Sequence, residues 1–431
     1  MASEGRLSSD ISHFATVSPG IPIVPESTPR TLALCSSKDA SAVRSDEGVL
    51  VHRHSQDLRR LFVGLTGILV AVGVQMVHSA SLTSRPGEAD THFIVRHIMY
   101  LTVATGLAAF ASQIPSQVIR RNVRFLLPAF VLLLLLVLVP GVGVRVNGAQ
   151  RWLRLGGLSV QPSEFGRIIL PIIAAERVCH LRSGGYSIRI LPQLAMPLII
   201  VLPMVAIEPD LGATVFLATG YILALFLGGL PFRYFGGAFL LVAPAAVSLF
   251  VLRPYQMKRI TGFVQAWQDL TRAPWQIKQS LLSLGAGGLE GEGIGAGWQK
   301  LSYLPEANTD FVFAVIGEEL GLVGTLTICF VWLTLFLTGR SALSCIRRDS
   351  FEWIVGSTLL LQLVLQAMAN IAVVTAMVPP KGVPHPFISY GGTNLLVSLL
   401  AVGLIYGLTF LKLGARPRST RFRPPRHRIR E

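Results

Sequence analysis

Long apolar runs are the feature that most constrains this chain, and residues 125–140 form a clear example. Apolar runs of about 17 to 25 residues cross the hydrocarbon layer of a bilayer as helices. Charged residues make up 14% of the chain, whereas they supply about a quarter of a typical soluble domain. Because the mean hydropathy is also high, at +0.57, we predict an all-α polytopic membrane protein.

About ten runs are long enough to span the membrane, and an even number places both termini on one side. Arginines flank the first run at Arg53, Arg59 and Arg60, and others follow the last run. The positive-inside rule makes that side cytoplasmic. The arginines of three connecting loops fall on the same side: Arg120, Arg121 and Arg124; Arg177, Arg182 and Arg189; Arg340, Arg347 and Arg348. The expected spans are residues 61–80, 93–111, 124–140, 164–180, 191–208, 211–229, 235–252, 311–338, 353–378 and 391–412.

The two ends of the chain differ from the spans in composition. Residues 1–58 are rich in Ser, Pro and charges of both signs, which predicts a disordered cytoplasmic tail before a transmembrane domain at 59–413. Residues 414–431 form a basic tail. From Lys412 to Glu431 there are eight Lys or Arg and one Glu, almost half of the net charge of +15. We expect this tail to lie against anionic lipids and not to bind nucleic acid, which is the alternative for a basic segment.

The cysteines do not form a recognisable framework. The four residues Cys35, Cys179, Cys329 and Cys345 are far apart and lack the spacing of metal ligands. None of them falls in a loop expected outside, so no disulfide and no cysteine metal site is predicted.

Two larger loops are expected on the outer side. The first, residues 141–163, carries three arginines where the positive-inside rule disfavours them, which suggests a task such as holding an anion. The second, residues 253–310, contains seven glycines between Gly285 and Gly297. Glycines let a backbone approach a ligand closely, or they simply make a loop flexible. As a phosphate cradle the glycine run is a weak signal, because it follows no strand.

Asp310 ends the second loop, immediately before an apolar segment that starts at Phe311. A carboxylate at that depth must face water, a substrate or a cation, because hydrocarbon cannot solvate it. On residue types alone, helix capping is the simpler interpretation, since Asn308, Thr309 and Asp310 are all common N-cap residues.

Other polar residues lie inside or beside the spans. Glu164 and Arg167 are three residues apart, so they share a helix face and can form an ion pair or hold a ligand. Glu208 and Asp210 flank a proline in a tight outer turn, where capping of the next helix is expected.

Two further segments are candidates for the same region. Glu318 follows Asp310 by eight residues, about 12 Å along a helix. Its angular offset of about 80° would let it face the same cavity, while Glu319 points away. Ser389 precedes two glycines at the start of the last span, where glycines also allow close helix packing.

Several short segments occur in one order along residues 60–413 and carry a resemblance to a known family. Together they resemble the FtsW/RodA (SEDS) membrane proteins of bacterial cell-wall synthesis. Asn147-Gly148 and Tyr303–Ala307 followed by Gly317–Glu319 look closer to the FtsW branch than to the RodA branch. The segments are Val77–Ser81, Gly148–Trp152, Gln161–Glu164, Pro209–Gly212, Arg259-Ile260 with Gln279-Ser280, Gly287–Gly295, Leu304–Gly321 and Pro386–Gly392.

The resemblance implies a peptidoglycan glycosyltransferase. Such an enzyme polymerises lipid II into glycan strands at the outer face of the cytoplasmic membrane during cell division, with inversion, and expels undecaprenyl diphosphate. The implied partners are a class B penicillin-binding protein, which is the transpeptidase, and other membrane proteins of the division complex. The implied location is the division septum.

The resemblance also assigns residues. Asp310 matches the aspartate that the family is thought to use as general base. Arginines or a divalent cation (Mg²⁺ or Mn²⁺) can neutralise the diphosphate, and no organic cofactor is expected. Arg151, Arg259 and Arg167 are the candidate diphosphate contacts, Trp152 anchors at the lipid interface or stacks on sugar, and Gln161, Glu164, Lys300, Glu318 and Ser389 complete the predicted substrate-binding set.

Two positions depart from the family pattern. Asn308 stands where the family usually has His, so a proton-relay role for that histidine is not available here. Arg167 stands where Lys is usual, which keeps the charge but changes the hydrogen-bond geometry. Three other functions stay open from the sequence: a lipid II flippase, a RodA-type elongation polymerase and a non-catalytic division scaffold.

Overall fold

The computed structural model describes residues 36–81, 88–146, 149–184, 191–208, 210–236, 254–301 and 304–414. The chain divides into two units, residues 1–53 and 54–431. In the first unit the described residues, 36–53, are helical. The second unit contains the strands and the rest of the helices. Asn147-Gly148, Tyr303, most of the expected span at 235–252 and all but the first residue of the tail at 414–431 lie outside the described residues.

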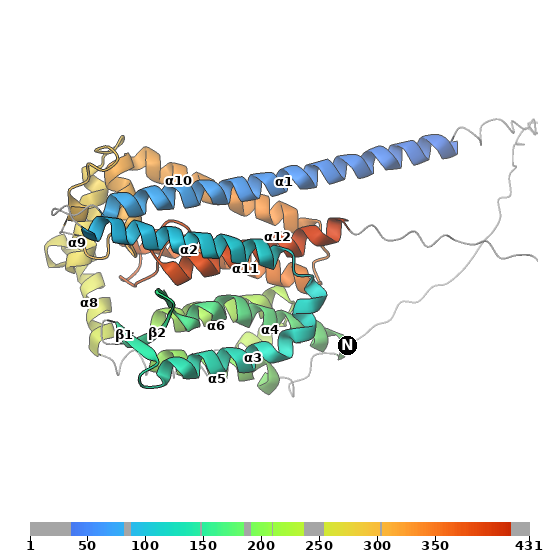
Figure 1. The fold of residues 1–431 in the computed structure, drawn as a ribbon, viewed down its shortest axis with the longest axis horizontal. Coiled ribbons are helices and arrows are strands. Elements are labelled where there is room, and N and C mark those ends of the chain that lie inside the picture. The colour runs from blue at the N-terminus through green and yellow to red at the C-terminus, as the bar shows by residue number, and fades with distance from the viewer. Residues whose placement is uncertain are drawn as a thin grey trace, which may run out of the picture. The chain divides into compact units, whose positions relative to one another are not determined.

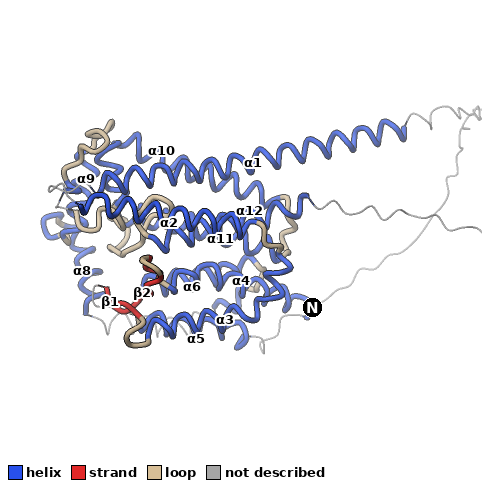
Figure 2. Tube along the Cα trace, viewed as in Figure 1, coloured by secondary structure: helices blue, strands red, loops and turns tan. Residues whose placement is uncertain are grey.

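The second unit is built mainly from helices, with a small sheet at one end (Figure 1, Figure 2). Its longer helices run side by side, and α8, α9 and the strands lie at one end of them (Figure 1). The helices are α1 (Ser36–Ser81), α2 (Glu88–Ser112), α3 (Ser116–Leu138), α4 (Pro162–Gly184), α5 (Leu191–Ile207), α6 (Leu211–Leu227), α8 (Pro254–Gln268), α9 (Trp275–Ala286), α10 (Val312–Ser344), α11 (Phe351–Val374) and α12 (Gly392–Gly414). The strands are β1 (Gly143–Val146), β2 (Ala149–Leu155) and β3 (Leu158–Val160).

The expected membrane spans are largely present as helices. Among the described residues, six helices are long and apolar enough to cross a membrane, and α5 and α6 are shorter apolar helices. Helix α4 is as long as a span, but Glu164, Arg167, Glu176 and Arg177 make it more polar than those six. The polytopic membrane class is therefore confirmed, while the total of ten spans and the side of the termini stay predictions.

Helices α4, α11 and α12 form the centre of the second unit. α12 packs against α2, α11 and α4, and α4 packs against α3, α6 and α11. The apolar part of α12 is 83% buried, whereas that of α2 is 17% buried. Polar groups on the central helices are thus screened from lipid by the outer ones.

Of the predicted disordered tail at residues 1–58, the structure describes residues 36–58, and residues 1–35 lie outside the described part. Residues 36–58 are helical, as the beginning of α1, where the sequence composition predicts disorder. Residues 36–58 contain no proline and a single glycine, Gly48. A helix nucleated in the apolar span can therefore propagate toward the N-terminus at little cost per residue.

Loops expected on the inner side meet at one end of the helices. Arg120 Nε lies 2.8 Å from Glu176 Oε2. Arg182 Nη1 lies 2.9 Å from Asp349 Oδ1, and its Nη2 donates to the carbonyl of Gly228 at 2.7 Å. The described parts of these loops thus share one end, as the arginine pattern predicts.

The first outer loop contains structure that the all-α prediction omits. β1, β2 and β3 form an antiparallel sheet in that order, with an irregularity between Val144 and Arg145. The sequence of β2, Ala-Gln-Arg-Trp-Leu-Arg-Leu, alternates partly between apolar and polar side chains, as expected of a strand with one covered face. Tyr100 of α2 fixes the sheet, because its hydroxyl donates to the carbonyl of Ser159 at 2.8 Å and accepts from the Ser159 N–H at 2.6 Å.

Helix α10 is interrupted at Gly321, whose φ of 64° and ψ of −163° are not helical. The glycine-rich loop supplies hydrogen bonds across this break. Glu292 N and Gly293 N donate to the carbonyls of Glu318 and Glu319, each at 3.0 Å, and Leu322 N donates to the carbonyl of Gly288 at 3.0 Å. The glycines therefore serve close backbone pairing, since a Cβ on Gly321 would lie 2.4 Å from the nitrogen of Gly291.

Candidate active site

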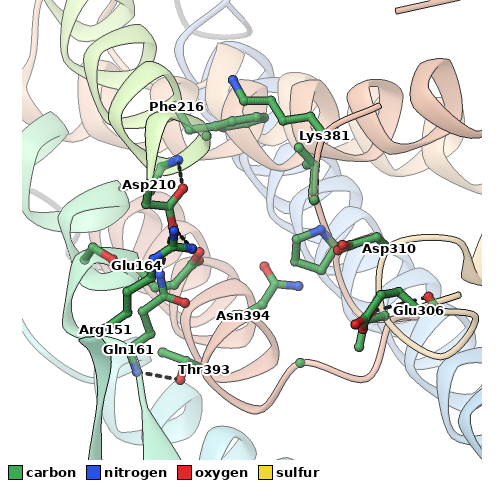
Figure 3. Close-up of a pocket in the computed structure, with 18 of the residues that line it drawn as sticks. Arg151, Gln161, Glu164, Asp210, Phe216, Glu306, Asp310, Lys381, Thr393 and Asn394 are labelled. Atoms are coloured by element: carbon green, nitrogen blue, oxygen red, sulfur yellow. Dashed lines mark hydrogen bonds and ion pairs between the residues drawn. The ribbon is translucent and has the colours of Figure 1, made fainter. Parts of the chain in front are cut away.

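A cavity of about 970 Å³ is lined by residues of the sheet and of neighbouring helices and loops (Figure 3). Its wall combines β2, α4, the start of α6, α8, the turn before α10, the 380–384 loop and the start of α12. Figure 3 shows two polar groups on facing sides of the cavity, with Asn394 between them. The charged side chains that line it are Arg151, Arg167, Arg259, Lys381, Glu164, Asp210, Glu306 and Asp310.

Asp310 occupies one side of this cavity, in a turn that precedes α10. Burial raises the pKa of Asp310 to about 7, the negative charge of Glu306 adds to the rise, and Arg259 opposes it. A carboxylate with a pKa near neutrality can both take and release a proton at physiological pH. Asp310 is not an N-cap, because the residue at that position of α10 is Phe311, which makes no side-chain cap hydrogen bond.

Three successive backbone carbonyls fix the Asp310 turn. The carbonyl of Asn308 accepts from Tyr390 N at 2.7 Å, and that of Thr309 accepts from Ser389 Oγ at 2.5 Å. The carbonyl of Asp310 accepts from Asn370 Nδ2 at 2.7 Å. The backbone that carries the carboxylate is thus held by α11 and by the segment before α12.

The facing side is organised by Asp210. Its Oδ1 accepts from Ala213 N at 2.9 Å, which confirms the predicted capping of α6. Its Oδ2 lies 3.5 Å from Arg151 Nη1 and accepts from Gln161 Nε2 at 3.2 Å. Arg151 Nε also donates to the carbonyl of Glu208 at 2.6 Å. Capping and cavity lining are therefore combined in one residue, and the sequence indicated only the capping.

Glu164 and Arg167 form the predicted ion pair, with Nη1 of Arg167 2.7 Å from Oε2 of Glu164. Arg167 also donates to Asn394 Oδ1 at 2.9 Å and to Gln366 Oε1. Both charged residues line the cavity, so the ion-pair and ligand interpretations are compatible. Three acceptors around one guanidinium fix its position at the cavity floor.

Lys381 is a lining residue that the sequence analysis missed. It belongs to the loop between α11 and α12, and burial lowers the pKa of its ammonium group. Arg259 of α8 lines the same region and donates to the carbonyl of Pro380 at 3.3 Å. A signal was available, because Lys381 is a basic residue in a loop expected outside, as are the arginines of residues 141–163.

Three predicted substrate-binding residues do not line the cavity. Lys300 is fully buried and lies 2.5 Å from Glu319 Oε1, with Ser79 Oγ bonded to both. Ser389 holds the Thr309 carbonyl. Glu318 Oε1 accepts from Trp298 N at 2.6 Å and from Gln299 N at 2.9 Å.

The expectation that Glu318 faces the same cavity as Asp310 is wrong. The offset of about 80° holds only for a helix that includes Asp310, but α10 begins at Val312. The other predicted site residues do line the cavity together: Arg151, Trp152, Gln161, Glu164, Arg167, Arg259 and Asp310.

The described residues contain no group of three His, Cys, Asp or Glu side chains placed to hold a metal ion. Asp210 and Glu164, the acidic residues opposite Asp310, are each beside an arginine. The donor set therefore does not fit a cation held by protein ligands alone. Cys179, Cys329 and Cys345 are free thiols.

A bundle of apolar helices with a deep charged cavity at one end defines a polytopic membrane protein suited to a charged ligand. The comparisons with known proteins agree with this class. The FtsW/RodA/SpoVE family, described as cell cycle proteins, matches residues 59–411, and the chain belongs to this family.

Curated relatives are similar over most of the chain. The probable peptidoglycan glycosyltransferase FtsW of Trichlorobacter lovleyi is 37% identical over 349 residues, which cover 79% of this chain and 90% of the relative. The protein of the same name from Coxiella burnetii is 37% identical over 351 residues, covering 79% and 93%. That of Legionella pneumophila is 34% identical over 370 residues, covering 82% and 92%. These relatives place the chain on the FtsW side of the family.

Solved structures share the fold. A chain from a peptidoglycan synthase complex that coordinates polymerization and crosslinking matches with a TM-score of 0.65 at 25% identity, covering 81% of this chain and 96% of that one. The rod shape determining protein RodA of Thermus thermophilus matches with a TM-score of 0.59 at 25% identity, covering 81% and 95%.

Proposed function

We propose that this chain is a peptidoglycan glycosyltransferase of the FtsW branch, which polymerises lipid II during cell division. The observation that carries the proposal is the Asp310 carboxylate, with a pKa raised to about 7, in a cavity that it shares with Arg259 and Lys381. The names of the FtsW relatives and the synthase complex support it.

In the proposed reaction, Asp310 accepts the proton of a sugar hydroxyl. The oxygen of that hydroxyl forms a bond to the anomeric carbon of a second lipid II molecule. The bond from this carbon to the diphosphate breaks, and its electron pair leaves with undecaprenyl diphosphate. Asp310 then gives up its proton to water. Attack on the face opposite the leaving group inverts the anomeric carbon. One carboxylate is enough because the diphosphate, unlike the leaving group of a glycoside hydrolase, can leave without being protonated.

Basic side chains neutralise the charge that develops on the leaving diphosphate. Arg259 lies on the Asp310 side of the cavity, since it opposes the rise in the pKa of Asp310. The Lys381 side chain reaches the start of α6 instead, because a Cβ on Gly212 would lie 3.4 Å from its Cε. Arg151 of β2 lies on the side of the cavity that faces Asp310 (Figure 3). Diphosphate is a good leaving group, so neutralising its charge contributes more than protonating it.

The remaining lining residues hold the sugars and shape the wall. The Glu164–Arg167 pair fixes the floor, and Gln161 bridges to Asp210. Trp152 lines the cavity from β2, where its indole ring can stack on a sugar. The substrate thus meets hydrogen-bonding groups on several faces.

We propose a divalent cation only as an ion that binds together with the diphosphate of the substrate. Mg²⁺ usually keeps several waters and binds one or two carboxylates together with substrate phosphates. The described carboxylates do not form a cation site of their own, so a cation would bind here only together with the substrate diphosphate.

The proposed setting is the outer face of a bacterial cytoplasmic membrane at the division septum. The proposed partners are a class B penicillin-binding protein and other membrane proteins of the division complex, with anionic lipids near the basic tail. The chain from a complex that coordinates polymerization and crosslinking supports a transpeptidase partner.

The proposal is tested by incubating labelled lipid II with the full-length chain and its cognate transpeptidase in vesicles. We expect glycan polymer longer than one disaccharide. Translocated lipid II without polymer would favour a flippase. Absence of both, from a stable complex that restores division in cells, would favour a scaffold. Rescue of an elongation mutant rather than a division mutant would point to the RodA branch.

A further inference from the structure

Asn370 makes two hydrogen bonds that join the turn carrying Asp310 to the loop carrying Lys381. It lies in α11, fully buried. Its Nδ2 donates to the carbonyl of Asp310 at 2.7 Å and to the carbonyl of Val383 at 2.8 Å. One side-chain amide therefore binds the turn of the carboxylate and the loop of Lys381.

The orientation of this amide follows from its partners. Both neighbours are backbone carbonyls, which only accept, so the nitrogen must face them with its two hydrogens. The amide oxygen Oδ1 then has no hydrogen-bond partner among the described residues. A buried oxygen without a partner is unfavourable. The two donated bonds therefore explain the residue better than general stability does.

The loop of Lys381 touches Asp310 at the point that Asn370 secures. A Cβ on Gly382 would lie 2.8 Å from Asp310 Oδ2, so this backbone lies against the carboxylate. The next residue, Val383, has the carbonyl that Asn370 holds. The two hydrogen bonds of Asn370, to Asp310 and Val383, are called the clamp below. The clamp holds the loop one residue away from Gly382, where the loop comes closest to the Asp310 carboxylate.

A second side chain of α11 also holds the loop that carries Lys381. Gln366, one turn earlier on the helix, donates to the carbonyl of Pro384 at 2.7 Å. Gln362, a further turn along the same face, is equally buried but has no hydrogen-bond partner among the described residues. The hydrogen bonds of this polar face to the loops are therefore concentrated at its cavity end.

We propose that Asn370 is a positioning residue for glycosyl transfer, which sets the separation between the Asp310 carboxylate and the Lys381 loop. This inference rests on the proposed function. Asn370 does not line the cavity, so it acts through Asp310 and Lys381 and not on the substrate. Loss of the clamp should misplace the base relative to the bound sugar more than it weakens binding.

The test compares Asn370→Leu with Gln362→Leu in the full-length chain bound to its transpeptidase. Both changes replace a buried amide on the same face of α11 by an apolar side chain of similar size. For Asn370→Leu we expect kcat to fall about 10²-fold with little change in KM, as for a small misplacement of a reacting group. Gln362→Leu should keep the wild-type kcat.

Hydrogen–deuterium exchange gives a second readout that needs no activity. Asn370→Leu should speed exchange in residues 305–315 and 380–390, and Gln362→Leu should not. If Asn370→Leu does not fold, Asn370→Asp, which keeps the shape but removes donors when ionised, should give the same kinetic and exchange changes.

Unchanged kcat in the Asn370 variants, or an equal loss in Gln362→Leu, would overturn the inference. If the wild-type complex makes no polymer, the proposed function fails by itself. Hydrogen–deuterium exchange then tests the clamp by itself. Faster exchange of residues 305–315 and 380–390 in Asn370→Leu supports the clamp, and unchanged exchange contradicts it.

Discussion

Gly382 lies directly against the carboxylate of Asp310. A Cβ placed on this glycine would be 2.8 Å from Oδ2 and 3.5 Å from Cγ of the aspartate. Contacts below 3.0 Å essentially do not occur for real Cβ atoms. Any other side chain at this position must therefore displace either the proposed base or the loop that carries Lys381.

Gly382→Ala should accordingly reduce kcat by about 10²-fold, because a shift of about 1 Å in a reacting group has that effect. The measurement is the rate of glycan formation from labelled lipid II. Gly106→Ala is the matched control, since an added methyl group there meets no atom within 4 Å and the site is helical. Equal rates for wild type and Gly382→Ala would show that the close contact does not matter.

The rate should rise with pH through about 7. The pKa of Asp310 is raised to about 7, and a general base works only when deprotonated, so activity is lost as pH falls below that value. Because burial lowers the pKa of Lys381, its positive charge is lost at a lower pH than in water, which predicts a decline on the alkaline side. A pH–rate profile between about pH 5 and 10 measures both limbs. A rate that is constant from about pH 5 to 8 contradicts the assignment.

Lys300 and Glu319 form a fully buried ion pair that ties the glycine-rich loop to α10. Lys300→Met should destabilise the protein by about 3 to 5 kcal/mol, because it leaves a buried carboxylate unpaired. The double variant Lys300→Met/Glu319→Gln should regain part of that loss. Thermal unfolding in detergent measures both. Equal stability of the single and double variants would mean that pairing is not the source of the effect.

Chelation tests whether a divalent cation takes part in the reaction. If Mg²⁺ or Mn²⁺ binds together with the diphosphate, EDTA should slow polymerisation, and added cation should restore it. Because no described group of three ligands is placed to hold a metal, chelation should leave the thermal unfolding temperature unchanged. A large drop in that temperature would instead indicate a structural metal held by the protein.

The apolar pattern of the sequence predicts the membrane class, and Asp310, which the sequence analysis named as a site residue, lines the cavity. The apolar length of the spans is a local property, and Asp310 belongs to a distinctive segment at the end of the second outer loop. Arg151, Arg259 and the Glu164–Arg167 pair were also predicted to belong to the site, and they line the cavity with Asp310. The resemblance to the family assigned these residues to the site, whereas residue types alone favoured helix capping for Asp310.

The supporting residues could not be found in this way. Asn370 is 60 positions from Asp310, so its contact with the Asp310 carbonyl depends on how the helices pack. The small sheet was missed because apolar runs dominate the pattern around it. The Glu318 prediction failed because Asp310 lies before the start of α10 at Val312, and the Glu318 carboxylate accepts from Trp298 N and Gln299 N instead.

The most direct test of Asp310 as the base is the rate of polymerisation from lipid II by the complex carrying Asp310→Asn. This change keeps the size of the side chain and removes its charge. Glu290→Gln is the control, since Glu290 is an exposed acid outside the cavity. We predict no polymer from Asp310→Asn, wild-type rates from Glu290→Gln, and normal binding of the transpeptidase by both. Polymer at the wild-type rate from Asp310→Asn would contradict the assignment of Asp310 as the base.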